Sequence, residues 1–381
     1  MMTRLGDVCT VISGSTPKTS VAEYWDGDIK WITPAELNED SFYLYDSQRH
    51  ITELGKEKTG LSYMPIGTVI LSSRAPIGKT AIAGCEMCCN QGFKNLICSD
   101  DIFNEYLYYF LKGKTDYLNS LGRGATFKEI SKSIVENIEI RLPALEEQKQ
   151  IARQFGEIYR LISLRKQQLA RLDELVKARF VELFGDTILN PFGWKKDLLG
   201  TVCDVRDGTH DSPQYFESGY PLVTSKNVTG GKIDLTDCSL ICEADFKKIN
   251  ERSKVDIGDI IMPMIGTVGK PVIVDIEPNF AIKNVSLIKF KADSRVLNTY
   301  IRALLQSDYF DDAVLSKVRG GTQKFISLGD IRKLEVLVPP MELQEQFATF
   351  IKQTDKSKLA IQQSLDKLET LKRSLMQKYF E

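Results

Sequence analysis

The chain has 381 residues, of which 27% are charged, and its formal net charge at pH 7 is −1. A chain of this length should form two or three domains, and its balanced charge neither indicates nor excludes a nucleic acid partner, because such binding depends on a local basic surface. It has no run of eighteen apolar residues and no apolar leader segment, and its eight cysteines fit a reducing compartment, so we expect a soluble, cytoplasmic protein.

Residues 1–142 have the pattern of short strands joined by turns. A polar loop at 13–18 precedes a predicted strand at 29–33, and 67–83 predicts a strand, a turn and a second strand. Apolar residues recur at helical intervals over 104–121, and 138–142 predicts a last strand. This order is typical of a mixed domain of strands and helices.

The segment 144–184 predicts one long helix. It contains one glycine and no proline, and its apolar residues recur at steps of three and four. The apolar stripe consists of Ile151, Phe155, Ile158, Ile162, Leu169, Leu172 and Val176. At ~1.5 Å per residue the helix would be roughly 60 Å long. A helix with a single apolar stripe needs a partner surface, because local interactions alone stabilise it little.

The partner is predicted within the same chain. Residues 340–381 repeat the pattern 196 positions later, so that Gln344 matches Gln148 and Phe380 matches Phe184. Three polar residues interrupt the second apolar stripe, namely Thr354, Lys358 and Lys372. We therefore expect the two helices to pack together, but not as an uninterrupted two-stranded zipper.

The remainder of the second half repeats the first in the same order. Residues 199–203 echo 5–9, residues 258–270 echo 67–79, and 319–324 echo 123–128. Between these landmarks the two sequences differ, so we expect a duplicated frame that carries unlike inserts.

Connectivity predicts how the helices run. The first helix leads the chain into the second globular domain and the second helix starts from that domain, so the pair should be antiparallel and the two chain ends should lie near one another. We predict an α+β fold with two mixed α/β domains separated by two long antiparallel helices that form an intramolecular coiled coil, with approximate twofold duplication. The predicted parts are 1–142, 143–185, 186–338 and 339–381. A twofold protein with two unlike domains suits duplex DNA read at two unlike places.

Catalytic motifs are weak. Residues 73–80 have a serine where a phosphate-binding loop needs its first glycine. Residues 190–192 lack the second proline of an amino-methyltransferase motif, and we interpret them as the turn that opens the second domain. Residues 245–247 have the Asp-x-Lys shape found in nucleases, but nothing pairs with them. His210 beside Asp211 could be an acid–base pair, although a polar loop residue that contacts a base or phosphate is the preferred interpretation.

A cysteine cluster raises the alternative of a zinc site. Its members are Cys85, Cys88, Cys89 and Cys98, at spacings at which thiolates can share a tetrahedral ion. A second ligand pair is missing, and the chain has only two histidines. Packing is the preferred interpretation, and neither a metal nor another cofactor is expected.

Loops that combine Ser, Thr, Gly and basic residues recur at matched positions in both halves. Such loops can offer N–H and cationic groups to phosphates, while Arg, Lys, Asn and Gln can read base edges. The candidate DNA-binding residues of the first half are Ser15, Thr16, Lys18, Lys30, Ser73, Arg74, Lys79, Gln91, Lys94, Arg123, Thr126 and Lys128. Those of the second half are Thr209, His210, Thr224, Ser225, Lys226, Asn227, Thr267, Lys270, Lys283, Asn284, Arg319, Thr322, Gln323 and Lys324.

The chain has the order domain, helix, domain, helix, and it has Leu-Pro-x-Leu-x-Glu-Gln-type segments at 142–148 and 338–344. It also has Gly-Lys and Arg-Gly-x-Thr turns in both halves. In these features it resembles the specificity subunit of type I restriction-modification systems. The resemblance implies that each globular domain is a target-recognition domain for one half of a split DNA site. It also implies that the helices set the gap between the halves and dock modification (methyltransferase) subunits, two of them in the expected complex. Methyl transfer and ATP-driven cleavage would then belong to modification and restriction subunits.

Three leucines lie off the first apolar stripe and are candidate contacts with the methylating partner: Leu161, Leu164 and Leu175. Two rival hypotheses stay open at this point. The chain could be a self-contained DNA methylase or nuclease with an unfamiliar site, or a coiled-coil scaffold whose domains bind protein.

Overall fold

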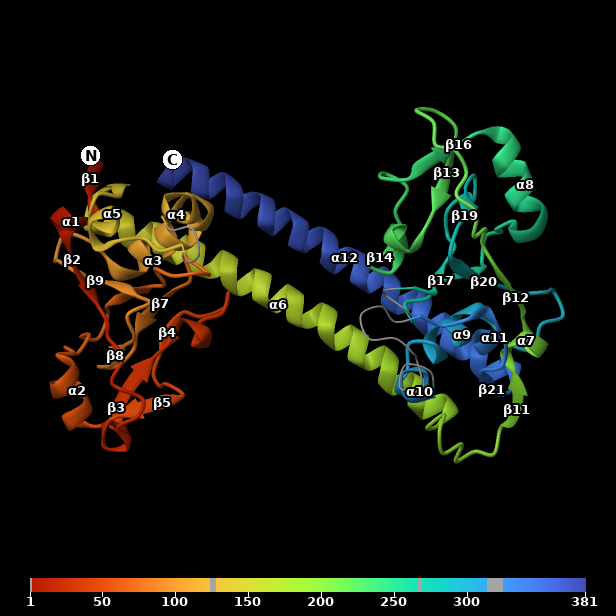
Figure 1. Cartoon of the computed structure of the whole chain (residues 1–381), viewed down its shortest axis with the longest axis horizontal. Helices are drawn as coiled ribbons and strands as arrows, with labels where there is room; N and C mark the ends of the chain where they lie inside the picture. The colour runs from red at the N-terminus through yellow and green to blue at the C-terminus, as the bar shows by residue number, and fades with distance from the viewer. Residues whose placement is uncertain (1, 124–127, 266–268, 314–324) are drawn as a thin grey trace. The chain divides into compact units, whose positions relative to one another are not determined.

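The computed structural model describes residues 2–123, 128–265, 269–313 and 325–381, which form two compact units (Figure 1). Unit 1 comprises Met1–Gln167 and Gln362–Glu381, and unit 2 comprises Gln168–Ile361. The first strand and the end of the last helix both belong to unit 1. None of the helices in the described ranges is long and apolar enough to cross a membrane.

Unit 1 contains a five-stranded sheet, a three-stranded sheet and a two-stranded ribbon. The first has the order β2-β9-β6-β7-β4, the second β5-β3-β8, and the ribbon pairs β1 with β10. The strands are β1 (Met2–Arg4), β2 (Cys9–Ser13), β3 (Trp25–Ile32), β4 (Tyr43–Leu44), β5 (Arg49–Ile51), β6 (Val69–Leu71), β7 (Thr80–Ala83), β8 (Cys88–Cys89), β9 (Lys94–Cys98) and β10 (Glu139–Arg141). The predicted strand pair within 67–83 is confirmed as the antiparallel pair β6 and β7.

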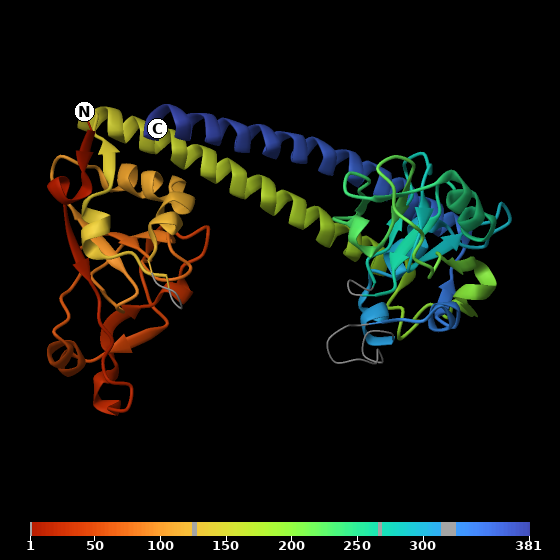
Figure 2. The same ribbon diagram turned by 45° about the horizontal axis from the view of Figure 1, so that its top comes forward.

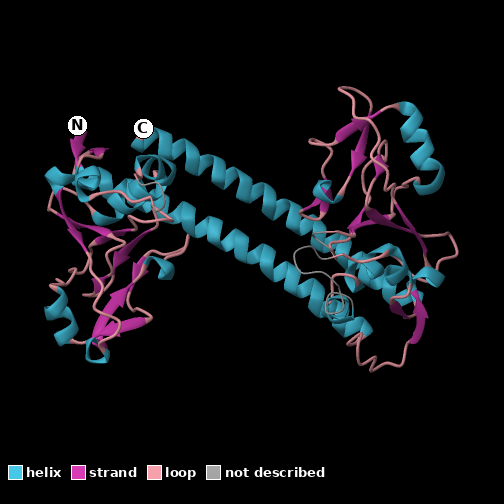
Figure 3. Ribbon diagram, in the orientation of Figure 1, coloured by secondary structure: helices cyan, strands magenta, loops and turns pink. Residues whose placement is uncertain are grey.

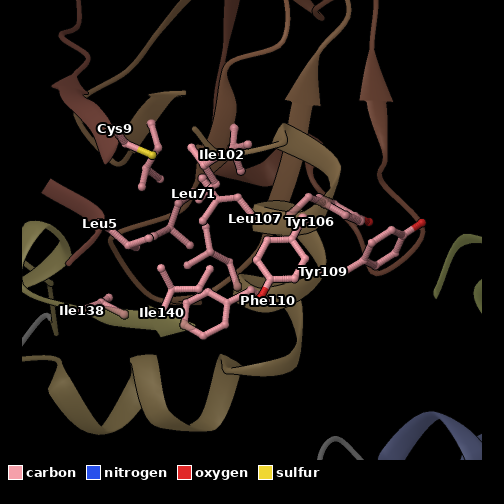
Figure 4. Close-up of a cluster of buried hydrophobic side chains, with 14 of the residues drawn as sticks. Leu5, Cys9, Leu71, Ile102, Tyr106, Leu107, Tyr109, Phe110, Ile138 and Ile140 are labelled. Carbon is pink, nitrogen blue, oxygen red and sulfur yellow. The ribbon is translucent and has the colours of Figure 1, made fainter. Parts of the chain in front are cut away.

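Among the helices of unit 1, α3 packs on the larger sheet and contributes to its core, whereas α2 packs against β3 of the smaller sheet. The helices are α1 (Leu5–Val8), α2 (Glu53–Thr59), α3 (Asn104–Gly113), α4 (Thr115–Leu121) and α5 (Lys132–Glu136), with 3-10 turns η1 (Ala22–Tyr24) and η2 (Pro34–Glu36). The helix predicted over 104–121 is thus two helices that meet at Lys114, whose backbone is not helical. Figure 4 shows side chains of α3, such as Tyr106 and Phe110, packed with Leu5, Leu71 and Ile140.

Unit 2 has a four-stranded sheet of order β12-β20-β17-β18, a three-stranded sheet of order β16-β13-β19, and the ribbons β11-β21 and β14-β15. The strands are β11 (Lys195–Leu198), β12 (Asp204–Asp207), β13 (Tyr220–Val223), β14 (Val228–Thr229), β15 (Lys232–Ile233), β16 (Ser239–Ile241), β17 (Ile260–Pro263), β18 (Val272–Ile273), β19 (Ala281–Ile282), β20 (Val285–Lys289) and β21 (Glu335–Val338). The helical elements are α7 (Leu199–Val202), η3 (Ser225–Asn227), α8 (Glu243–Ser253), α9 (Asn298–Leu304), α10 (Asp308–Ala313) and α11 (Leu328–Arg332).

The duplication extends further than the sequence indicated. The antiparallel pair β2 and β9 corresponds to β12 and β20, and the parallel pair β3 and β8 corresponds to β13 and β19. In each half a further strand, β5 or β16, lies antiparallel on the other edge of that pair. The inserts were expected to be unlike, and their sequences are; these strand pairs nevertheless repeat, while the larger sheet of unit 1 adds β4 and unit 2 adds the β14-β15 ribbon.

Both long helices are confirmed, as α6 (Leu145–Phe184) and α12 (Met341–Phe380) (Figure 3). Each contributes one portion to unit 1 and the other to unit 2 (Figure 2). In unit 1, Phe155 stacks on Phe380 at a centroid distance of 5.4 Å, and Arg165 donates to Ser364 at 3.2 Å. Because higher numbers on α6 meet lower numbers on α12, the portions run antiparallel there.

The portions in unit 2 are antiparallel as well. The Lys358 ammonium pairs with Asp173 at 2.5 Å, while Phe184 packs edge-on against Phe347 with centroids 5.5 Å apart. The three polar interruptions in the α12 stripe are accommodated by local partners. Lys358 has Asp173, Thr354 donates its hydroxyl to the Phe350 carbonyl, and Lys372 pairs with Glu369.

Candidate nucleic-acid interface

In unit 1 a loop begins where β2 ends. A side chain at Gly14 would collide with the carbonyl oxygens of Cys89 and Asn90, so only glycine allows this close approach. The next residue, Ser15, donates its N–H to the Cys89 carbonyl at 3.0 Å, and the Thr16 hydroxyl bonds to the side chain of Gln91. The loop therefore lies directly against the segment that joins β8 to β9, and their polar side chains come together.

Two tryptophans hold the same loop through hydrogen bonds to its backbone carbonyls. The Trp31 indole donates to the Ser15 carbonyl at 3.0 Å, and the Trp25 indole donates to the Lys18 carbonyl at 3.3 Å. The exposed Arg49 guanidinium lies 3.6 Å from the centre of the Trp25 ring, a cation–π contact. Because the loop carbonyls are bonded inward, the Lys18 side chain is left exposed.

A basic cluster continues this surface. The Glu129 carboxylate accepts from Arg74 Nε at 2.9 Å and from Lys94 Nζ at 3.3 Å, and these cations lower its pKa although partial burial opposes them. Backbone bonds join Glu129 to Arg123 in both directions. The cluster adjoins the first loop, because Ser73 N–H donates to the Gly92 carbonyl at 2.7 Å.

Unit 2 builds the corresponding loop after β12. A side chain at Gly208 would collide with the carbonyl oxygen of Ile282, and Thr209 N–H donates to that carbonyl at 3.0 Å. The turn between β19 and β20 makes a second hydrogen bond to this loop, in which Asn284 N–H donates to the Thr209 carbonyl at 3.2 Å. The Gly14 loop and the Gly208 loop therefore occupy equivalent places in the repeated fold.

The side chains on the Gly208 loop form a network. The His210 ring places Nε2 2.8 Å from Asp207 Oδ2 and Nδ1 2.9 Å from Asn284 Oδ1, and these two contacts raise the pKa of His210. Arg252, from α8, bonds to the other oxygen of Asp207. Lys283 donates to the Ser212 hydroxyl at 2.7 Å. Several donors and cations are thus gathered at one loop cluster.

The structure sorts the predicted DNA-binding residues by accessibility. The exposed ones are Lys18, Arg74, Gln91, Arg123, Lys128, His210, Lys226 and Lys270. Those that are half-buried are Ser15, Thr16, Lys30, Thr209, Thr224, Ser225, Lys283 and Asn284. The remaining predictions at Thr126, Thr267, Arg319, Thr322, Gln323 and Lys324 lie outside the described residues.

Four predicted side chains face inward, against the expectation that they lie on an exposed DNA-binding surface. Ser73 is fully buried, and Lys94 is buried with its ammonium on Glu129. Lys79 donates to the carbonyls of Pro34 and Leu37 at 3.3 and 2.6 Å, so its ammonium holds a turn of the domain. Asn227 is buried and accepts from the Thr224 N–H at 3.0 Å as a cap.

Comparison with known protein families shows to which family the chain belongs. The type I restriction modification DNA specificity domain matches twice, over residues 1–174 and 191–373. The chain belongs to the type I restriction-modification DNA specificity family. As a specificity subunit it recognises DNA and is not the catalytic component of the complex. The family resemblance seen in the sequence is thereby confirmed.

Individual relatives agree with this assignment. The MjaIX type I restriction enzyme specificity subunit of Methanocaldococcus jannaschii is 33% identical over 379 residues, which span 91% of this chain and 85% of the relative. The EcoKI specificity subunit of Escherichia coli is 22% identical, spanning 98% of this chain and 86% of the relative. The fold matches the crystal structure of a type I restriction-modification S subunit from M. genitalium with a TM-score of 0.60 at 15% identity, covering 100% of this chain and 96% of that one.

Residues of the catalytic and metal-binding motifs considered in the sequence make structural contacts. Asn190 closes a turn by two hydrogen bonds with the backbone of Trp194, as the turn interpretation predicted. In the Asp-x-Lys motif, Phe246 stacks on Tyr220 at 4.0 Å and Lys247 pairs with Glu243. Adjacent Cys88 and Cys89 enter different apolar clusters.

The three predicted partner leucines are accessible to different degrees. Leu164 and Leu175 are exposed on α6, and Leu161 is half-buried. Leu371 lies 196 positions after Leu175 and is exposed to the same extent, 47% against 48%. An exposed leucine is therefore repeated at equivalent positions on the two long helices.

Sequence reasoning missed five residues of the candidate interface: Trp25, Trp31, Arg49, Asp207 and Arg252. The tryptophans and Arg49 belong to the first insert, and Arg252 lies on α8, more than forty residues from its partner Asp207. The sequence repeat contained one signal that could have identified Asp207, since Asp207 directly precedes Gly208 just as Ser13, in the predicted polar loop, precedes Gly14.

Proposed function

We propose that this specificity subunit reads a two-part, asymmetric DNA site, with residues 1–142 recognising one half and residues 186–338 the other. In this proposal the helical segments 143–185 and 339–381 set the gap between the halves. Two target-recognition domains that share these strand pairs would each present one loop cluster to one half-site. Duplex DNA accepts such readers because its major groove displays a distinct donor and acceptor pattern for each base pair.

The single observation that carries the proposal is the pair of glycine loops. Gly14 and Gly208 are held by the same kind of backbone contact, yet the residues around them differ. Thr16 stands where the second half has His210, and Lys18 stands where it has Ser212. Equivalent loops with different donors fit two domains that read different sequences.

A further proposal concerns the subunits that this chain binds. Type I systems combine specificity subunits with methyltransferase and restriction subunits, and we propose that this chain binds two modification subunits. The repeated exposed leucines, Leu175 in unit 2 and Leu371 in unit 1, support two equivalent docking places. Exposed apolar side chains at repeated positions are suited to partner contacts.

A binding and modification assay tests the recognition proposal. The full chain, co-expressed with the modification subunits encoded by its own system, is mixed with duplexes that carry the target mapped by sequencing methylated sites. We expect methylation only when both halves of the target are present and only with the modification subunits. Methyl transfer or cleavage by the purified chain alone, with S-adenosylmethionine or magnesium, would favour a self-contained enzyme instead.

A further inference from the structure

Asp207 is a buried carboxylate that holds two exposed donors. Its side chain is 7% exposed, whereas the His210 and Arg252 side chains are 62% and 66% exposed. One carboxylate oxygen binds Arg252 and the other lies 2.8 Å from His210 Nε2. These donors come from separate elements, the loop after β12 and the end of α8. Asp207 therefore fixes two outer side chains that would otherwise be mobile.

We propose that Asp207 is a positioning residue that presents Arg252 to a hydrogen-bond acceptor of duplex DNA in the second half-site, and holds beside it a protonated His210 whose positive charge favours the DNA. This inference rests on the proposed function and names residues that carry it. The acceptor is a phosphate oxygen or the O6/N7 edge of a guanine, since both take charge-assisted hydrogen bonds from an arginine guanidinium.

The geometry around His210 fits the protonated ring. Nε2 faces a carboxylate oxygen and Nδ1 faces the amide oxygen of Asn284, so both ring nitrogens are placed to donate. Asn284 is itself held by a left-handed backbone (φ 55°) and by its bond to Thr209. A ring that donates from both nitrogens is an imidazolium, which adds positive charge where DNA would bind.

Neighbouring charges affect whether the His210 ring is protonated or neutral. Asp207 on β12 favours the imidazolium and Arg252 on α8 opposes it. Lys283, in the turn before β20, is engaged with Ser212, and Asp211 follows on the loop itself. Hydrogen bonds to Asn284 and Asp207 raise the pKa of His210, and they outweigh partial burial and the Arg252 charge, which lower it. Affinity for the second half-site should therefore be high below that pKa and fall as the pH rises through it.

The test measures duplex binding by the full chain assembled with its modification subunits, from pH 6 to pH 8.5. Variants are His210→Gln, Asp207→Asn and Arg252→Gln. His50→Gln is the matched control, because His50 is the other histidine of the chain and lies in β5 of unit 1. Each variant is compared with the wild type in thermal unfolding. If Asp207→Asn fails to fold, His210→Gln and Arg252→Gln carry the test.

We expect wild-type affinity to fall about tenfold across this range, because the ring loses the positive charge that favours the DNA. His210→Gln should bind with nearly constant affinity across the range, and His50→Gln should follow the wild type. Arg252→Gln should weaken binding about tenfold at every pH. A smaller salt dependence in Arg252→Gln indicates a phosphate contact, and relaxed preference at one base pair of the second half indicates a guanine contact.

Two results would overturn the inference. One is His210→Gln with the pH dependence of the wild type, and the other is Arg252→Gln with unchanged affinity, salt dependence and base preference. Failure of the wild-type complex to bind its mapped duplex at any pH would instead contradict the proposed function itself. The two failures are thus distinguished by the wild-type measurement.

Discussion

Gln148 and Gln344 occupy equivalent positions near the starts of α6 and α12, and each makes the same three hydrogen bonds. Gln148 accepts from Phe103 N–H at 2.8 Å and donates to two backbone carbonyls, at Asp101 and Pro143. Gln344 accepts from Leu297 N–H at 2.8 Å and likewise donates to two carbonyls. Both side chains are fully buried, so each amide fastens a long helix to the globular part of its unit.

Replacing either glutamine should destabilise the unit that contains it. Gln148→Leu or Gln344→Leu leaves buried backbone groups without partners, at a cost of about 1–3 kcal/mol each. Chemical denaturation with hydrogen exchange should detect the loss in unit 1 for the first variant and in unit 2 for the second. Gln150→Leu and Gln346→Leu are matched controls, because those glutamines are exposed at equivalent positions two residues later. Equal effects in variants and controls would show that the hydrogen bonds contribute little.

The glycine loops should respond separately. Gly14→Ala forces a methyl group onto the carbonyl oxygens of Cys89 and Asn90, and Gly208→Ala forces one onto that of Ile282. Each should distort its loop at a cost of about 1–3 kcal/mol and weaken recognition of one half-site only. Binding to duplexes with one half scrambled measures this. Gly329→Ala in unit 2, where an added methyl group would meet only the Ser327 hydroxyl at 3.7 Å, should leave recognition unchanged. If both halves weakened equally with each variant, the division of labour between the loops would be wrong.

Exposed and inward-facing lysines and arginines should behave differently. Lys18→Ala, Arg74→Ala and Lys226→Ala remove exposed cations, and each lost phosphate contact should reduce the slope of log affinity against log salt by about 0.9. Lys79→Ala should lower stability without changing that slope, since its ammonium holds the carbonyls of Pro34 and Leu37. Titrations at several salt concentrations check both statements. An unchanged slope in all three exposed variants would remove them from the interface.

The repeated leucines should control assembly with the modification subunits. Leu175→Glu or Leu371→Glu should weaken one of two docking places and leave complexes with a single modification subunit, while the double variant should lose both. Native mass spectrometry gives the stoichiometry directly. The exposed Leu189, in the loop after α6, provides a control as Leu189→Glu. Full assembly of the double variant would exclude this docking surface.

Sequence reasoning predicted the frame well for a physical reason. Helical periodicity and the 196-residue repeat report which faces are buried, and α6 and α12 were accordingly found within one residue of each end. It predicted the interface less well, because residue type does not reveal direction. Ser73, Lys79 and Lys94 look like surface residues in a polar turn, yet they are bonded inward. The Asp207–Arg252 pair joins distant segments, and only the folded chain brings them together.

The claim that the helices set the distance between two separate readers is tested most directly by lengthening both of them. A seven-residue helical block is inserted after Gln167 in α6 and another after Ile361 in α12, and methylated sites are sequenced in a host that carries the complete system. We predict that both half-site sequences stay the same and that the unspecified gap between them becomes longer. Altered half-site sequences with the original gap would contradict it.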